Sequence, residues 1–340
     1  MPPHILNSII ESGNPKQRER ASKTLECSCR IRRKRCQPPG KAPHPPHDKL
    51  YRIVYDWRKG TDPGSEVRTE DQPPTVDPAV EEAFHGTGAA YDLFHDEYGR
   101  ISIDDRGSDV VSVVHWLDNP YQSQWDAERI FFGDGDEDEP EGDRLFNRFT
   151  KAVECIGHEF AHGVVWCSAR LAGEGEPGAL NEHFADVFGS LVKQRHLHQT
   201  ADEADWLFGM GILAGNPMGG IRSLKAPGTA YGDPLLGKDP QPDHMKGYLD
   251  YVDFDDGGVH VNSGIPNRAF YEAARRIGGY AWEKAGLIWY DTLAKKLQPM
   301  STFQDAADAT YQTAGERYGI EMPEQKAVAE AWKVVGIRVS

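Results

Sequence analysis

The amino-acid sequence predicts an α+β protein of two lobes, a β-rich N-terminal lobe and a helical C-terminal lobe, with a cleft between them. From residue 50 to about 135, short runs of β-branched and aromatic residues are separated by Gly, Pro and Asp, as strands are by turns. From about residue 145 onward, apolar residues recur mainly at helical spacing. This segregation of strands from helices is typical of α+β folds.

Length and composition are those of a soluble globular protein. The 340 residues can form a substantial core, and 39% hydrophobic with 27% charged residues is ordinary for this class. No run of about 18 apolar residues occurs, so no membrane span is expected. The start, "MPPHILNSII", lacks a standard secretory signal. We expect a soluble protein, secreted or released without such a signal, with a cytoplasmic location as the alternative.

Charge is distributed unevenly along the chain. Residues 1–50 carry a net charge of +7 and the remaining 290 residues carry −22. An acidic body disfavours nucleic acid as a partner, although a nucleic-acid binder that uses "RIRRKR" would fit the basic N-terminal part. The opposite charges predict that the two parts attract each other.

The order of elements divides the chain into three parts. Residues 1–49, here called the head, predict a short helical segment and a Pro-rich extended linker, "QPPGKAPHPPHDK". Residues 50–170 form the expected N-terminal lobe, with strands at "LYRIVYDW", "ISIDD", "DVVSVVHWL" and "RIFFGDGD" and a helix at "VDPAVEEAFHGTGAAYDLFHDEYG". Residues 171–340 form the helical lobe. Helices are expected over 145–170, 180–198, 203–213, 263–276, 280–296, 301–318 and 323–335.

The five cysteines predict no disulfide. Cys27, Cys29 and Cys36 lie in "CSCRIRRKRC", which lacks the second pair of a structural zinc site. Cys155 and Cys167 are twelve residues apart, and a helix would separate them by about 18 Å, beyond disulfide reach. Both are expected to be free thiols.

The stretch "ECIGHEFAHGVVW" contains the spacing H-E-x-x-H. On a helix, His158 and His162 lie about 40° apart on one face, so both imidazoles can reach one metal ion. Glu159 lies beside that face, where it can take a proton from a metal-bound water. The alternative is a buried amphipathic helix with two hydrogen-bonded histidines.

A second stretch, "GALNEHFADVFGSL", supplies a third ligand. Asn181 and Glu182 lie in its first turn, and Glu182 with His158 and His162 completes a three-ligand zinc set that leaves one position open. Asp186 follows by one helical turn and can accept the second imidazole N–H of a ligand. The alternative, a polar helix start before an apolar run, is less favoured beside "HEFAH".

A third stretch, "DFDDGGVHVNSG", places His260 five residues after Asp255. His260 is either a lone histidine in a turn or the donor that stabilises a developing oxyanion, with Asp255 orienting the ring.

These three stretches resemble, in order and in spacing, the signature segments of the thermolysin-like neutral metallopeptidases. "VVSVVHW", "FFGDGD" and "GGIRSL" resemble further segments, so the resemblance covers about residues 50 to 338. It implies a thermolysin-like two-lobe fold and a secreted hydrolase, a metalloendopeptidase that cuts protein or peptide substrates with one catalytic Zn²⁺. The implied zinc ligands are His158, His162 and Glu182.

The resemblance also implies the roles of the neighbouring residues. Glu159 would be the general base and His260 the oxyanion donor, while Asp186 supports His158 and Asp255 orients His260. The expected substrate-binding residues are Arg222 and Asn181. An apolar pocket that selects large apolar residues after the scissile bond would be lined near Phe146, Phe149, Cys155, Phe208, Ile212 and Ile221.

Three departures from the family pattern stand out. The position of an oxyanion-assisting tyrosine falls near Gly173, and "QSQW" places Gln122 where the family has a substrate-binding Asn. A zinc-binding protein without catalysis is therefore the alternative. The family's double calcium site keeps the carboxylate of Glu154 but meets Lys193 and two apolar residues, Leu207 and Met210, instead of acidic ones. A lysine there disfavours Ca²⁺, and other calcium sites stay open.

The head resembles the short propeptide of the protealysin-like subgroup, on "PPHIL" and "GNPKQRERASKTL". This resemblance implies a zymogen that the head inhibits from within the same chain; a disordered basic tail is the alternative. Apolar side chains at helical spacing, namely Ile5, Leu6, Ile9 and Ile10, are expected to be buried against the cleft. A cut is expected between Arg35 and Leu50. A further hypothesis is that Cys27, Cys29 or Cys36 ligates zinc in the latent form.

Overall fold

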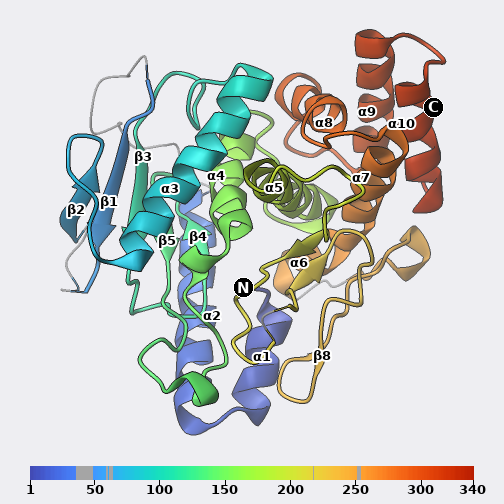
Figure 1. Ribbon diagram of the computed structural model, residues 1–340. Helices are drawn as coiled ribbons and strands as arrows, with labels where there is room; N and C mark the ends of the chain where they lie inside the picture. The colour runs from blue at the N-terminus through green and yellow to red at the C-terminus, as the bar shows by residue number, and fades with distance from the viewer. Residues whose placement is uncertain (36–48, 59, 61–63, 217, 251–253) are drawn as a thin grey trace.

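The computed structural model describes residues 1–35, 49–58, 60, 64–216, 218–250 and 254–340, with the side chains of residues 29–35 left out. It has the predicted α+β architecture. A lobe formed by a mixed sheet and its covering helices lies at one side of the molecule, and a helical lobe lies at the other side (Figure 1). The expected linker and its cutting site lie largely outside the described residues. No described helix is long and apolar enough to cross a membrane.

The N-terminal lobe is built on a five-stranded sheet of order β2-β1-β3-β5-β4. Its strands are β1 (Arg52–Asp56), β2 (Ser65–Thr69), β3 (Val110–Val114), β4 (Ser123–Trp125) and β5 (Ile130–Phe132). β1, β3 and β5 are parallel, and the outer strands β2 and β4 are antiparallel to their neighbours. The short strand β4 is thus an edge strand, and it lies against the helix that carries H-E-x-x-H.

The helices of the body begin with α3 (Pro78–Asp92), which packs on the sheet and continues into a π-helical turn, η1 (Leu93–Glu97). α4 (Val153–Cys167) and α5 (Gly175–His196) pack along each other at the centre of the molecule. The remaining helices are α6 (Asp255–Asn262), α7 (Gly264–Ile277), α8 (Lys284–Lys295), α9 (Phe303–Tyr318) and α10 (Pro323–Val334). Short elements are η2 (Glu141–Asp143), η3 (Phe149–Lys151), η4 (Met245–Gly247), β6 (Leu207–Phe208), β7 (Arg222–Ser223), β8 (Gly232–Asp233) and β9 (Gly237–Lys238).

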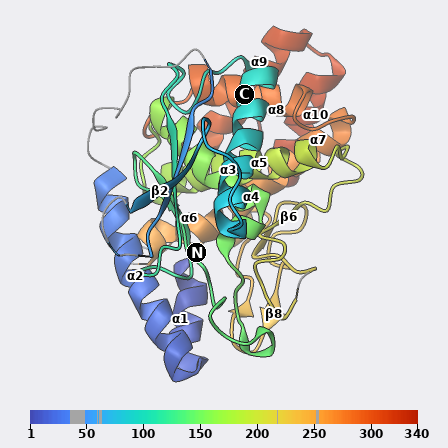
Figure 2. The same ribbon diagram turned by 60° about the vertical axis from the view of Figure 1, so that its left-hand side comes forward.

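The head forms two helices, α1 (Pro3–Ser12) and α2 (Pro15–Arg35), which pack against each other (Figure 2). Between them, Asn14 and Gln17 exchange side-chain-to-backbone hydrogen bonds of 2.9 Å, which start α2 as a capping box does. Figure 1 shows that the N-terminus lies between the two lobes, close to α6. The chain therefore begins in the region where the cleft was expected.

The head covers the outer face of the sheet. Alternate residues of β3 point to opposite faces, with Val114 in the main core and Val113 in a separate cluster. That cluster joins Val113, Trp116 and Phe131 to Cys27 of α2. Every residue of β3 is consequently buried, which explains why four of its five residues are valine.

Two expected elements are wrong. Residues 203–213 are a loop around β6 and not a helix, because Trp206, Gly209 and Gly211 have positive φ angles of 59°, 74° and 85°. The stretch "ISIDD" is a turn and not a strand: its Asp104 side chain accepts two backbone N–H groups, which favours a local turn over a sheet ladder. The helix expected over 145–170 also starts later than expected, at Val153.

Candidate active site

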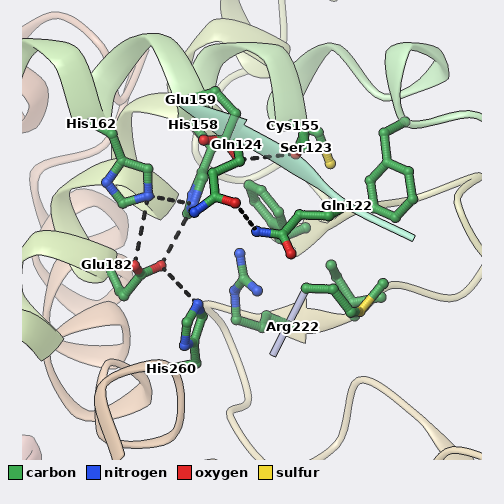
Figure 3. A pocket seen from close by; sticks show the side chains of 14 residues that line it. Gln122, Ser123, Gln124, Cys155, His158, Glu159, His162, Glu182, Arg222 and His260 are labelled. Carbon is green, nitrogen blue, oxygen red and sulfur yellow. Dashed lines mark hydrogen bonds and ion pairs between the residues drawn. The ribbon is translucent and has the colours of Figure 1, made fainter. Parts of the chain in front are cut away.

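Three side chains converge at the junction of α4 and α5. The Nε2 atoms of His158 and His162 are 3.0 Å apart, and each lies 3.6 Å from a carboxylate oxygen of Glu182 (Figure 3). Tetrahedral zinc with bonds of about 2.0 Å holds its ligands about 3.3 Å from one another. The spacing therefore fits a zinc ion bound by these three residues.

The partners of the two Nδ1 atoms show that the Nε2 lone pairs of both rings point towards the place between the three ligands. His162 Nδ1 lies 2.8 Å from Asn181 Oδ1, and His158 Nδ1 lies 3.0 Å from Asp186 Oδ1. Since both partners are acceptors, each Nδ1 carries the hydrogen, and each Nε2 presents its lone pair to the other ring. Two lone pairs and a carboxylate directed at one place require a cation.

Glu182 gives independent support for a cation site. Its Oε2 atom is buried, and none of the described residues forms a hydrogen bond with it. Burial by itself would raise the pKa of Glu182, but the nearby His260, His162 and His158 and the guanidinium of Arg222 hold it well below its usual value. The carboxylate is thus ionised and available as a ligand.

Glu159 is aimed by the edge strand of the sheet. Ser123 Oγ donates to Glu159 Oε1 over 2.9 Å, and the backbone N–H of Trp125 donates to Oε2 over 2.7 Å. Both donors belong to β4, so the packing of this strand on α4 sets the direction of the carboxylate. The expected base therefore lies beside the three ligands, within the same pocket.

His260 reaches the site from α6. Its Nδ1 lies 2.7 Å from Asp255 Oδ1, and its backbone N–H donates to Asp255 Oδ2 over 2.9 Å. Asp255 and the three residues after it have positive φ angles, which the glycines at positions 257 and 258 tolerate, and this turn brings the carboxylate back onto the imidazole. His260 Nε2 is then 3.6 Å from Glu182 Oε2.

Arg222 lies on β7 at the floor of the pocket. Its guanidinium donates to both oxygens of Asp186, over 2.8 and 2.6 Å, and stacks over the ring of Phe208 at 4.3 Å. Burial would raise the pKa of Asp186, but the charge of Arg222 and the bond with His158 lower it. Asp186 therefore serves a zinc ligand and Arg222 together.

The apolar wall of the pocket is partly as expected. Phe149, Cys155, Phe208 and Ile221 line the pocket that contains the three ligands. The two remaining residues of the expected set, Phe146 and Ile212, are fully buried in the core and are not part of the lining.

Asn181 has a different contact from the one expected. Its side chain holds Nδ1 of His162 and donates to Leu171 O over 3.4 Å, so it is engaged with a ligand and not directed at the pocket. Asn181 directly precedes Glu182 in the sequence, and this position next to a ligand was the available signal that its side chain could contact another ligand. Gly173 lies in the exposed loop between α4 and α5.

The head enters this site. Met1 lines the same pocket as the three ligands, and the imidazole of His4 lies 2.7 Å from the hydroxyl of Tyr231. Ser28 Oγ of α2 donates to Oε1 of Gln122, which stands where the family pattern has a substrate-binding Asn. No pattern in the sequence predicted that the first residue itself would reach the pocket.

Burial of the head agrees with the expected apolar pattern. Ile5, Leu6 and Ile9 are fully buried, and Ile10 packs on the core from a partly buried position. Cys27 is buried against the sheet, so the hypothesis that it ligates zinc is wrong. The side chain of Cys29 and all of Cys36 lie outside the described residues.

Ion pairs hold the N-terminal part of α2 against an acidic loop of the body. Arg20 Nη1 lies 2.5 Å from Asp136 Oδ1, and its Nη2 lies 2.7 Å from Asp138 Oδ2. Lys16 Nζ adds a 2.9 Å contact with Asp138 and a contact with Glu139. Asp136 is buried, which makes its pair with Arg20 the least screened of these contacts.

Lys193 occupies a cluster of oxygen atoms beside the zinc site. Its ammonium lies 3.0 Å from Asp205 Oδ1, 3.2 Å from the backbone oxygen of Leu207 and 3.6 Å from Glu154 Oε1. The backbone N–H of Met210 donates to Glu154 over 3.0 Å. These are the residues at which the family's double calcium site was expected to be damaged. The three thiols that the structure describes, those of Cys27, Cys155 and Cys167, form no disulfide.

Comparison with known proteins identifies the family. The family model described as thermolysin metallopeptidase, catalytic domain, matches residues 48–166, and that described as thermolysin metallopeptidase, alpha-helical domain, matches residues 169–337. The chain belongs to the thermolysin metallopeptidase family. With the site described above, it is a zinc-dependent metalloendopeptidase.

Relatives extend over almost the whole chain, the head included. The extracellular metalloprotease of Pectobacterium carotovorum subsp. carotovorum is 42% identical over 350 residues, covering 100% of this chain and 96% of that protein. Protease PrtS of Photorhabdus sp. (strain Az29) is 46% identical over 296 residues, covering 86% and 78%. The solved precursor of protealysin from Serratia proteamaculans superimposes with a TM-score of 0.86 at 44% identity, covering 99% of this chain and 98% of that one. The protealysin-like resemblance is thereby confirmed.

Proposed function

We propose that this chain is a latent precursor of an endopeptidase that cuts on the N-terminal side of large apolar residues. One observation carries both parts of the proposal. Met1, an apolar residue, lies in the pocket of the zinc ligands among Phe149, Cys155 and Phe208. A substrate residue of similar size and polarity would meet the same walls, and it has no access while the head is docked.

The residues of the site divide the chemistry between them. Bound at His158, His162 and Glu182, zinc would polarise the scissile carbonyl and acidify a water molecule. Glu159 would take the proton of the attacking water and deliver it to the leaving amine. His260, held by Asp255, would donate a hydrogen bond from Nε2 to the developing oxyanion.

Substrate orientation falls to the rim of the pocket. Arg222 would donate to the carbonyl of the residue after the scissile bond, since its guanidinium is buried and already fixed by Asp186. Gln122 would hold the substrate backbone once Ser28 has left its Oε1. Because Ser28 occupies Gln122 and Met1 occupies the pocket, the head would compete with substrate for this site.

The observed contacts also suggest how latency ends. Cutting between residues 35 and 50 leaves the head held only by non-covalent contacts, namely its buried apolar side chains and the ion pairs of Arg20. The names of the Pectobacterium relative and of the extracellular minor metalloprotease of Serratia marcescens, 48% identical over 207 residues, place those proteins outside the cell. We propose the same location for this enzyme; recovery of all activity from the cytoplasm would contradict it.

A casein assay on purified chain, followed over time with N-terminal sequencing, tests the proposal. Activity should appear only as the head is lost, and a zinc chelator should abolish it. Glu159→Gln should retain zinc and lose turnover, which also separates a peptidase from a zinc-binding protein without catalysis. Full activity of an intact chain that begins at Met1 would overturn latency, and cleavage of a peptide library before charged residues would overturn the specificity.

A further inference from the structure

A buried chain of hydrogen bonds leads from the zinc site into the helical lobe. Trp289 Nε1 on α8 donates to His183 Nε2 over 2.9 Å, and His183 Nδ1 lies 2.8 Å from Asn267 Oδ1 on α7. Asn267 Nδ2 then donates to Asp186 Oδ2 over 2.9 Å. All four side chains are at most 1% exposed, so solvent does not compete for these bonds.

Trp289 fixes the direction of every bond in this chain. An indole N–H can only donate, so His183 Nε2 must accept with its lone pair and the hydrogen of the neutral ring is on Nδ1. This N–H donates to Asn267 Oδ1, which turns the amide so that its NH₂ group faces Asp186. A reversed amide would place an oxygen against the carboxylate.

Asp186 is the point at which the chain of bonds meets the site. Its Oδ2 accepts from Asn267 and from Arg222 Nε, while its Oδ1 accepts from Arg222 Nη2 and lies 3.0 Å from Nδ1 of His158. A carboxylate with donors on both oxygens cannot rotate without breaking a buried bond. Losing the Asn267 bond frees one side of it.

We propose that His183 is a positioning residue of the zinc site, which acts through Asn267 to hold the Asp186 carboxylate in the one orientation that serves His158 and Arg222 together. His183 follows the ligand Glu182 directly, yet the turn of about 100° per residue carries its ring to the side of α5 that faces α7 and α8. It touches no reacting atom. The inference rests on the proposed zinc chemistry and concerns how tightly the metal is held.

Zinc release from the full-length chain tests this inference. The Glu159→Gln background prevents self-cleavage, and the rate of release to a chelating indicator requires no peptidase activity. His183→Leu should release zinc about tenfold faster, as loss of a ligand's outer partner does. His183→Gln should restore much of the wild-type rate, because its amide can accept from Trp289 and donate to Asn267.

A matched control separates positioning from stability. Thr292→Val removes a buried hydrogen bond of 3.0 Å to Thr313 from the same helix, α8, without touching the chain of bonds to Asp186. It should lower the melting temperature as other buried losses do and leave zinc release unchanged. Equal release rates for His183→Leu and Thr292→Val would overturn the inference. If His183→Leu does not fold, Trp289→Phe, which frees the tautomer of His183, should still speed release about threefold; an unchanged rate there would overturn it as well.

The outcomes for the two proposals remain distinct. Failure of the Glu159→Gln parent to bind zinc would count against the proposed peptidase chemistry. Tight binding by the parent with no difference between the His183 variants would count against positioning alone.

Discussion

Two polar clusters lie side by side between α4 and α5, and they differ in how their buried negative charge is neutralised. At the first, His158, His162 and Glu182 direct lone pairs and a negative charge at one place. At the second, Glu154 faces the ammonium of Lys193, which the chain itself provides. Oxygen and nitrogen ligands gathered in a buried site need a cation, and the difference between a metal site and an ion pair is whether a side chain supplies it.

Removing a ligand at the first cluster should have the largest effect. Glu182→Gln keeps the shape and loses the charge, so we expect zinc to be lost and peptidase activity to fall to background. The matched change at the second cluster, Glu154→Gln, should keep zinc and activity. Zinc content by atomic spectroscopy and a casein assay measure both, and equal zinc loss in the two variants would erase the distinction drawn here.

Removing the cation of the second cluster should cost stability and not chemistry. Lys193→Met leaves the buried carboxylate of Glu154 without its cationic partner, which typically costs about 3–5 kcal/mol in the free energy of unfolding. Burial already raises the pKa of Glu154, against the effect of Lys193, so the loss should be smaller at pH 5 than at pH 8. Urea unfolding checks this, with Lys333→Met, an exposed pair with Glu330, as a control that changes little.

His4, a half-buried group, tests what happens when a positive charge forms in an unfavourable place. Burial lowers the pKa of His4 from 6.5 to about 4, and His260 and Arg222 disfavour its charged form although Asp255 favours it. Docking of the head is thus strongest above pH 6.5 and weakens as the pH falls towards 4, by about 3 kcal/mol at most.

Hydrogen exchange of α1 in the Glu159→Gln precursor measures this weakening. His4→Gln, which can still bond to Tyr231, should flatten the dependence between pH 6.5 and 4. Any pH dependence of exchange that remains in this variant is due to the other titratable groups that face His4. An unchanged pH dependence would contradict the role of His4 and assign the whole effect to those groups.

Added calcium should have the smallest effect. With the ammonium of Lys193 among the oxygens of Glu154, Asp205 and Leu207, Ca²⁺ has no place in this cluster. We expect millimolar Ca²⁺ to shift the melting temperature by less than about 1 °C. A clear rise would mean that a calcium site exists elsewhere, and a rise that Glu154→Gln abolishes would place it at this cluster.

The sequence alone determined the parts of the protein whose geometry is local. His158, Glu159 and His162 share one helix, so their spacing along the chain fixes their spacing in space. The apolar period of Ile5, Leu6 and Ile9 likewise sufficed to predict a buried helix face. The predicted helix over 203–213 is wrong because the geometry of this segment is not local. The burial of Trp206 and the positive φ angles of the glycines in this segment override its helical apolar pattern.

Only the tertiary structure decided which distant residues meet. Met1 lies in the zinc pocket, Arg20 pairs with Asp136, 116 residues away, and Asn267 links His183 to Asp186, 81 residues before it. Their side chains are ordinary in their own local sequence, so no local pattern distinguishes them. Their partners are selected by burial, since a polar group removed from water is stable only where the fold brings it a matching donor or acceptor.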